Sequence, residues 1–115
     1  MAITTNDYAG RITGSVFSKG GSAIVPPTGH VFVAITTLAA TTFSNTTGLV
    51  AETATVWANT EDAANDLAAD SETDVEGSGG EEVTQSDSFP TSITIHGRWN
   101  KVNVNSGSII AYIGK

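Results

Sequence analysis

The stretch TSITIHGRWNKVNVNSGSIIAYIGK, residues 91–115, carries the strongest signal for a fold class in this chain. Its first part alternates apolar and polar residues, as in ITIH at 93–96, which is the period of a strand with one buried face. The apolar segment SIIAYIG at 108–114 follows Gly107, which can adopt the positive φ that a tight turn requires. The stretch therefore predicts two strands joined as a hairpin.

Within this stretch, Arg98 directly precedes Trp99, and neighbouring side chains of a strand point to opposite faces. We predict that Trp99 fills the core and that Trp57, the second tryptophan, is also a core residue. Arginine is enriched at protein interfaces, so Arg98 and the nearby Lys101 are candidates for contact with a partner.

Upstream segments also favour strands, because Val, Ile and Thr are frequent and Leu is rare. The run HVFVAITTLAATTF at 30–43 is apolar on both faces, which predicts a strand buried on both sides or within an oligomer interface. A second strand is predicted at 49–60, and TEDAANDLAAD at 60–70 is the one plausible helical turn, with Thr60 as its cap. Together these patterns predict an all-β, single-domain antiparallel β-sandwich or small barrel.

The 115 residues have room for one domain. Residues 1–29 contain many turn signals and two adjacent prolines, which cannot donate ladder hydrogen bonds, so this segment is predicted to be an N-terminal arm or edge hairpin. Residues 30–115 are predicted to form the β-domain. An acidic insert at about 61–88 holds ten of the twelve acidic residues and is predicted to be a polar, self-repelling loop.

The formal net charge of −7 disfavours binding to phosphate backbones, so no nucleic-acid partner is expected. No run of 18 apolar residues occurs, and the first residues lack a basic start followed by an apolar run, so neither a membrane span nor a secretory signal is expected. The absence of cysteine excludes disulfides, thiol nucleophiles and cysteine-bound metals.

Part of the acidic insert spaces its carboxylates on alternate positions, as calcium ligands are spaced. An EF-hand loop that began at Glu72 would place Gly77 at its sixth position, but Val83 would stand at the twelfth, where a bidentate carboxylate is needed. We therefore predict a solvated loop and no metal site. The weak calcium candidates are Asp70, Glu72, Asp74 and Glu76.

No motif for catalysis or for a cofactor is present. The chain has no G-x-S-x-G elbow, no phosphate-binding loop and no dinucleotide-binding glycine pattern. His30 and His96 lie at predicted strand boundaries, where a surface or partly buried histidine is expected. We predict that the protein is not an enzyme and binds no cofactor; the unorganised carboxylates of the insert are the only basis for a small hydrolase.

The segment ITIHGRWNKVNVNSGSIIAYIGK at 93–115 resembles the C-terminal end of small virion proteins of tailed bacteriophages. In those chains a glycine–arginine–tryptophan step precedes a short strand, a serine–glycine turn and a closing IAY-x-G. The matching residues here are Gly97, Arg98, Trp99, Ser106, Gly107, Ile110, Ala111, Tyr112 and Gly114. Residues 29–60 and 89–115 share the resemblance, and the acidic insert does not.

This resemblance implies an all-β fold, no catalysis and a role in the phage particle, where some such proteins decorate the capsid. The expected function is a capsid decoration, or cement, protein that binds the major capsid protein on the outer surface of the head and stabilises the shell. A homo-oligomer is expected, with a trimer favoured. The candidate interface residues are Arg11, Lys19, Arg98 and Lys101.

An alternative from another class is a carbohydrate-binding module of a tail or fibre that attaches the phage to its host. Such a module needs exposed aromatic side chains, and most of the eight aromatic residues of this chain are assigned to the interior. The sequence therefore favours capsid decoration.

Overall fold

The structure is a computed structural model that describes residues 12–45, 47–52, 57–58, 60 and 83–115. Within these ranges the chain forms antiparallel strands and no helix, which confirms the prediction of an all-β fold, and no segment there is a helix able to cross a membrane. The strands are β1 (Ile12–Ser18), β2 (Val31–Thr37), β3 (Thr42–Phe43), β4 (Leu49–Ala51), β5 (Thr94–Val102), β6 (Val104–Ser106) and β7 (Ile109–Gly114).

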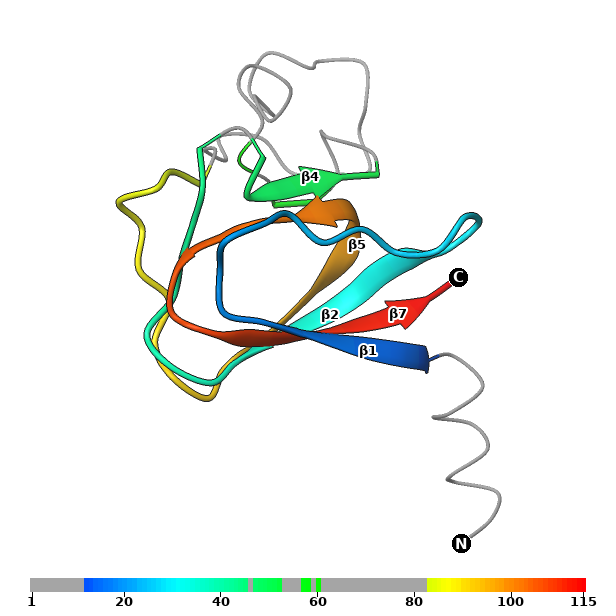
Figure 1. Ribbon diagram of the computed structural model, residues 1–115, viewed down its shortest axis with the longest axis horizontal. Helices are drawn as coiled ribbons and strands as arrows, with labels where there is room; N and C mark the ends of the chain where they lie inside the picture. The colour runs from blue at the N-terminus through cyan, green and yellow to red at the C-terminus, as the bar shows by residue number, and fades with distance from the viewer. Residues whose placement is uncertain (1–11, 46, 53–56, 59, 61–82) are drawn as a thin grey trace, which may run out of the picture.

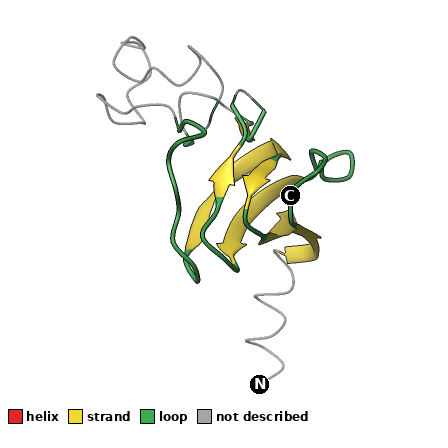
Figure 2. Cartoon of the chain, turned by 60° about the vertical axis from the view of Figure 1, so that its left-hand side comes forward, coloured by secondary structure: helices red, strands yellow, loops and turns green. Residues whose placement is uncertain are grey.

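Five strands form one sheet in the order β1-β7-β2-β5-β4, and β3 pairs with β6 in a second, smaller sheet (Figure 1). Loops join the strands at both ends of the main sheet (Figure 2). Strand β1 comes from the segment predicted to be an arm or edge hairpin, and it pairs with β7 at one edge.

The predicted C-terminal hairpin is wrong, although both of its strands exist. β2 lies between β5 and β7, so that Ile35 pairs with Ile95 on one side and with Ala111 on the other. The chain between β5 and β7 instead forms β6, which pairs with β3. The reason lies in β2, where the neighbours Ala34 and Ile35 are both buried. A strand that is apolar on both faces belongs at the centre of a sheet.

The strand predicted at 30–43 ends earlier, at Thr37, because buried threonines bond to loops there. The Thr37 hydroxyl is fully buried and donates to the carbonyl of Pro90 at 2.6 Å, and it accepts from the amide of Ile93 at 3.0 Å. The buried Thr41 hydroxyl donates to the carbonyl of Ala39 at 2.7 Å. Side-chain bonds of this kind offer backbone groups an alternative to the ladder, so the chain bends away from the strand.

The strand predicted at 49–60 is described only over Leu49–Ala51. Thr60, predicted as a helix cap, bonds across to Leu49: the amide of Leu49 donates to the Thr60 hydroxyl at 2.8 Å, and the amide of Thr60 donates to the Leu49 carbonyl at 2.9 Å. The remainder of the predicted helix at 60–70 and most of the acidic insert lie outside the described residues.

Trp99 is fully buried, as predicted, and occupies the centre of the core. Its ring lies against Gly97, because a Cβ atom at Gly97 would stand 2.6 Å from Trp99 Cζ2. The indole Nε1 donates to the carbonyl of Ala58 at 2.7 Å, so the buried polar atom has a partner. Trp57 is only half-buried and packs against this core. The core consists of Phe32, Ile35, Phe43, Leu49, Ala51, Trp99, Val102, Val104, Ile109 and Ala111.

Gly107 has the positive φ that the sequence predicted, at 96°. Close approach also requires glycine here, because a Cβ atom would collide with the carbonyl oxygen of Ala40 and with the hydroxyl of Thr41. The turn before β7 therefore needs glycine for both its conformation and its packing.

We expect Gly97→Ala to lower the free energy of unfolding by about 1–3 kcal/mol, because the added methyl group forces the buried Trp99 ring to move. Gly14→Ala is the matched control, since a Cβ atom there would meet Ile113 Cδ1 at an ordinary 3.5 Å. Urea titration of both variants measures the difference. Equal effects of the two substitutions would contradict the proposed packing of Trp99 on Gly97.

Candidate functional site

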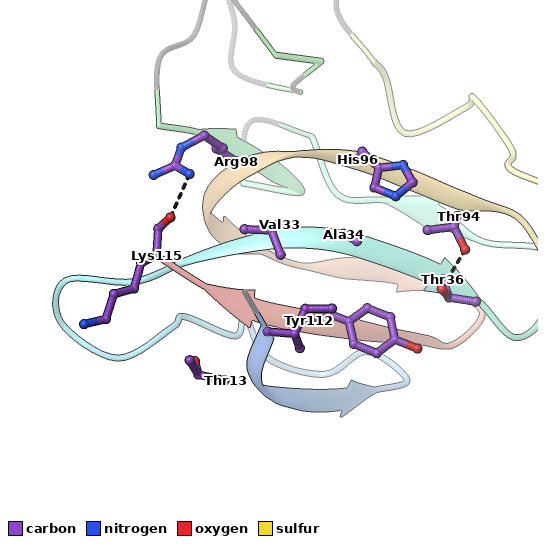
Figure 3. A pocket seen from close by; sticks show the side chains of 10 residues that line it. Thr13, Val33, Ala34, Thr36, Thr94, His96, Arg98, Tyr112 and Lys115 are labelled. Carbon is purple, nitrogen blue, oxygen red and sulfur yellow. Dashed lines mark hydrogen bonds between the residues drawn. The ribbon is translucent and has the colours of Figure 1, made fainter. Parts of the chain in front are cut away.

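One face of the five-stranded sheet packs against the core, and the opposite face is hollowed. The hollow has a volume of about 990 Å³ and is lined by residues from β1, β2, β5 and β7 (Figure 3). We call this surface the open face. Its polar and aromatic side chains are Thr13, Thr36, Thr94, His96, Arg98, Tyr112 and Lys115.

Strand register brings Tyr112, Ala34 and His96 into one row across β7, β2 and β5. Ala34 pairs with His96 on one side and with Tyr112 on the other. Directly paired residues share a face, so the methyl group of Ala34 lies between two larger side chains. The small middle residue gives the open face its depth (Figure 3).

A second row consists of Ile110, Thr36 and Thr94, where Thr36 pairs with both neighbours. The hydroxyl oxygens of Thr36 and Thr94 lie 2.8 Å apart and share a hydrogen bond. Phe17 of β1 extends this row at the sheet edge through its pairing with Ile110, and it is 58% exposed. This row is thus polar over β2 and β5 and apolar toward β1.

Arg98 points to the open face, as the alternation with Trp99 predicted, and binds Glu52 of the same chain. Its Nε donates to Glu52 Oε1 at 2.6 Å and its Nη2 donates to Oε2 at 3.2 Å, which is a bidentate arrangement. A third bond runs from Nη1 to the carbonyl of Lys115 at 2.9 Å (Figure 3). The interface candidate Arg98 is therefore already bound to Glu52 within the chain.

This pairing shifts the titration of both groups. The hydrogen bond from Arg98 lowers the pKa of Glu52 below its ordinary value, and the same bond raises the pKa of Arg98. The side chains of Arg98 and Glu52 are 35% and 39% exposed, so water screens the attraction between them. The pair orients the guanidinium more than it stabilises the fold.

The other predicted site residues lie apart from Arg98 or outside the described residues. Lys101 is half-buried and pairs with Val50 of β4, while Lys19 is exposed directly after β1. Arg11 lies outside the described residues, as do all four calcium candidates, Asp70, Glu72, Asp74 and Glu76. Elsewhere, in the part of the chain that is described, no cluster of three or more His, Asp or Glu residues could hold a metal ion.

His96 is exposed on β5, consistent with the expected surface position, and the half-buried His30 has its Nδ1 3.1 Å from the carbonyl oxygen of Thr28. Sequence reasoning did not single out Thr36, Thr94 or Tyr112 as site residues. The polar positions of ITIH were the available signal, but they indicate only a solvent-facing side of a strand.

No family model, curated protein or solved structure matches this chain. The chemistry of the open face must therefore be inferred from its own side chains. It combines three threonine hydroxyl groups, an imidazole, a guanidinium held by a carboxylate, a lysine ammonium group and a tyrosine ring. These groups bind ligands by hydrogen bonding and stacking.

Glu52→Gln is expected to lower the free energy of unfolding at neutral pH by about 0.2–1 kcal/mol, the range of exposed ion pairs. Because the pKa of Glu52 is lowered in the folded state, the ion pair stabilises the protein above the unfolded carboxyl pKa. Its contribution decreases as the pH falls through the lowered value. Urea titrations at neutral and acidic pH should show the difference between wild type and variant shrinking in acid; a difference that stays constant would contradict this role.

Proposed function

We propose that the protein is a non-enzymatic capsid decoration protein of a tailed bacteriophage, bound to the outer surface of the head. Its partner is the major capsid protein, and it acts as a homo-oligomer, with a trimer favoured. The resemblance of residues 29–60 and 89–115 to small phage virion proteins supports this proposal, and so does the exposed edge strand β1 of the main sheet.

The observation that carries the proposal is the position of β1 at the edge of the main sheet. Among the described strands, β1 has a single neighbour, β7, so its outer edge can accept a further strand. Its seven residues, ITGSVFS, include no charge and no proline, two of the devices that normally block such edges. The register shift on β1 lies between Ile12 and Gly14, and residues 14–18 pair regularly with β7. Phe17 on this strand is 58% exposed. An edge with these properties suits binding to another protein.

The opposite edge of the sheet differs. β4 has only three residues, and Thr60 bonds to both backbone polar groups of Leu49. A short edge covered in this way offers little to a partner. Binding by strand addition is therefore directed to β1.

Charge is also separated along the chain. Four of the five basic residues lie in the described ranges, whereas nine of the twelve acidic residues lie in 61–82. Opposite potentials speed association and align partners. The described residues alone carry four basic side chains against two acidic ones, Glu52 and Asp87, which would suit an acidic patch on a partner.

The mechanism that follows is adhesion. Each copy that binds only the assembled shell stabilises it by mass action. Many copies across subunit boundaries add their contributions, because the subunits of one shell are already held close together. No chemical step is required.

The decisive experiment mixes purified protein with matching capsids that lack it and measures co-sedimentation. We expect Phe17→Ala to weaken binding about tenfold or more, since burial of a Phe side chain contributes roughly 1.5–3 kcal/mol. Val25→Ala is the matched control, because Val25 is equally exposed, at 60%, but lies outside β1. Failure of the wild-type protein to bind would contradict the proposal, and equal losses for both variants would contradict the role of β1.

Location is tested separately by immunogold labelling of intact virions with an antibody raised against residues 61–82. Label over the head is expected. Label confined to the tail or fibres would replace capsid decoration with host attachment.

A further inference from the structure

We infer that the open face binds a neutral oligosaccharide, with the ring of Tyr112 as its stacking surface. This inference concerns the hollow, which Ile12 and Thr13 of β1 also line. Its argument uses the part over β7, β2 and β5 and not the outer backbone edge of β1 that the proposed function uses. It assigns a ligand class to a surface that the proposed capsid binding does not use.

The row across Ala34 forms a slot of suitable width. Tyr112 and His96 belong to strands that are separated by β2, so their backbones lie roughly 10 Å apart at the usual strand spacing. The Ala34 methyl group leaves the space between them open. Tyr112 is half-buried, and a tyrosine presents an apolar ring with a polar tip. The apolar C–H face of a sugar ring complements such a surface.

Beside the slot, the threonine pair supplies hydrogen bonds of both kinds. The hydroxyls of Thr36 and Thr94 use one hydrogen between them, across 2.8 Å. Each hydroxyl has one donor and two acceptor sites, so the pair retains a donor and several acceptors for a ligand. Sugar hydroxyls likewise donate and accept. The ring nitrogens of His96 add to the same set.

Charge argues for a neutral ligand. Glu52 neutralises Arg98 through two hydrogen bonds, and an anionic ligand would have to displace this carboxylate. Lys115 is the second cation of the lining, and its ammonium group points away from the row of Tyr112, Ala34 and His96 (Figure 3). A guanidinium has five N–H donors, of which Arg98 uses three, so two remain for uncharged hydroxyl acceptors. A phosphate or an acidic sugar gains less here than a neutral glycan.

The volume of the hollow and the side chains that line it favour an oligosaccharide over an extended peptide. The hollow of about 990 Å³ lies at the upper end of the roughly 300–1,000 Å³ typical of ligand sites, so it holds several sugar units. An extended peptide would require pockets for alternate side chains. Over β2 the hollow is lined by the short side chains of Val33, Ala34 and Thr36, which do not divide it into a series of such pockets. Weak binding at each site would become strong on any particle that presents many copies.

The test uses the full chain and calorimetry with three neutral hexasaccharides: cellohexaose, maltohexaose and chitohexaose. We expect at least one of them to bind. Tyr112→Ala should weaken that binding at least tenfold, Tyr112→Phe should preserve it because the ring remains, and Thr94→Val should weaken it several-fold. The unfolding midpoint of each variant shows whether it is folded.

Phe17→Ala is the aromatic control, since Phe17 lies on the same face but outside the hollow, and it should leave sugar binding unchanged. Absence of binding to all three hexasaccharides would overturn the inference, as would binding that Tyr112→Ala leaves intact or tighter binding of hexagalacturonate. Loss of capsid binding in Tyr112→Ala would instead identify the open face as a protein-docking surface. If that loss accompanied absence of hexasaccharide binding to the wild type, the sugar site would be overturned and capsid decoration would stand, so the two proposals fail separately.

Discussion

The packing of the Trp99 ring against Gly97 is the contact on which the rest of the structure depends. Trp99 lies on β5 and pairs with Phe32 of β2 and with Ala51 of β4, so one buried side chain joins three strands. The ring fits because Gly97, two residues earlier on the same face, has no side chain. Between them, Arg98 must point the other way, which places its guanidinium on the open face. The three consecutive residues Gly97, Arg98 and Trp99 thus place a large core side chain on one face of β5 and a guanidinium on the other.

Curvature of the main sheet produces the hollow. The register shifts between Phe32 and Ala34 on both sides of β2, and again between Ile12 and Gly14 on β1. Such irregularities bend strands and increase their twist. The sheet therefore curves as it passes from β1 to β4 (Figure 1). A flat sheet with the same side chains would have the same rows but a shallower face.

Buried threonines connect loops to strands in a chain without disulfides. Thr37, Thr41 and Thr60 are at most 2% exposed, and each bonds through its hydroxyl to backbone groups of distant or turning segments. A typical hydrogen bond contributes about 1 kcal/mol net, and an unpaired buried group costs more than that. Thr37, on the core face of β2, holds the segment before β5 in place, and Thr60 covers the β4 edge. Among the described strands, β1 is therefore the longer edge of the main sheet.

By itself the sequence determined the fold class and several local features. The all-β class, the burial of Trp99, the outward Arg98 and the positive φ of Gly107 all follow from alternation and steric fit, which act between residues close together in the chain. Tertiary structure alone decided which strands are neighbours. The predicted hairpin failed because β2 lies between β5 and β7, and only this order brings Tyr112, Ala34 and His96 into one row and Thr36 beside Thr94. Strand order depends on contacts between residues far apart in the chain, and the pattern of a single strand does not specify its partner.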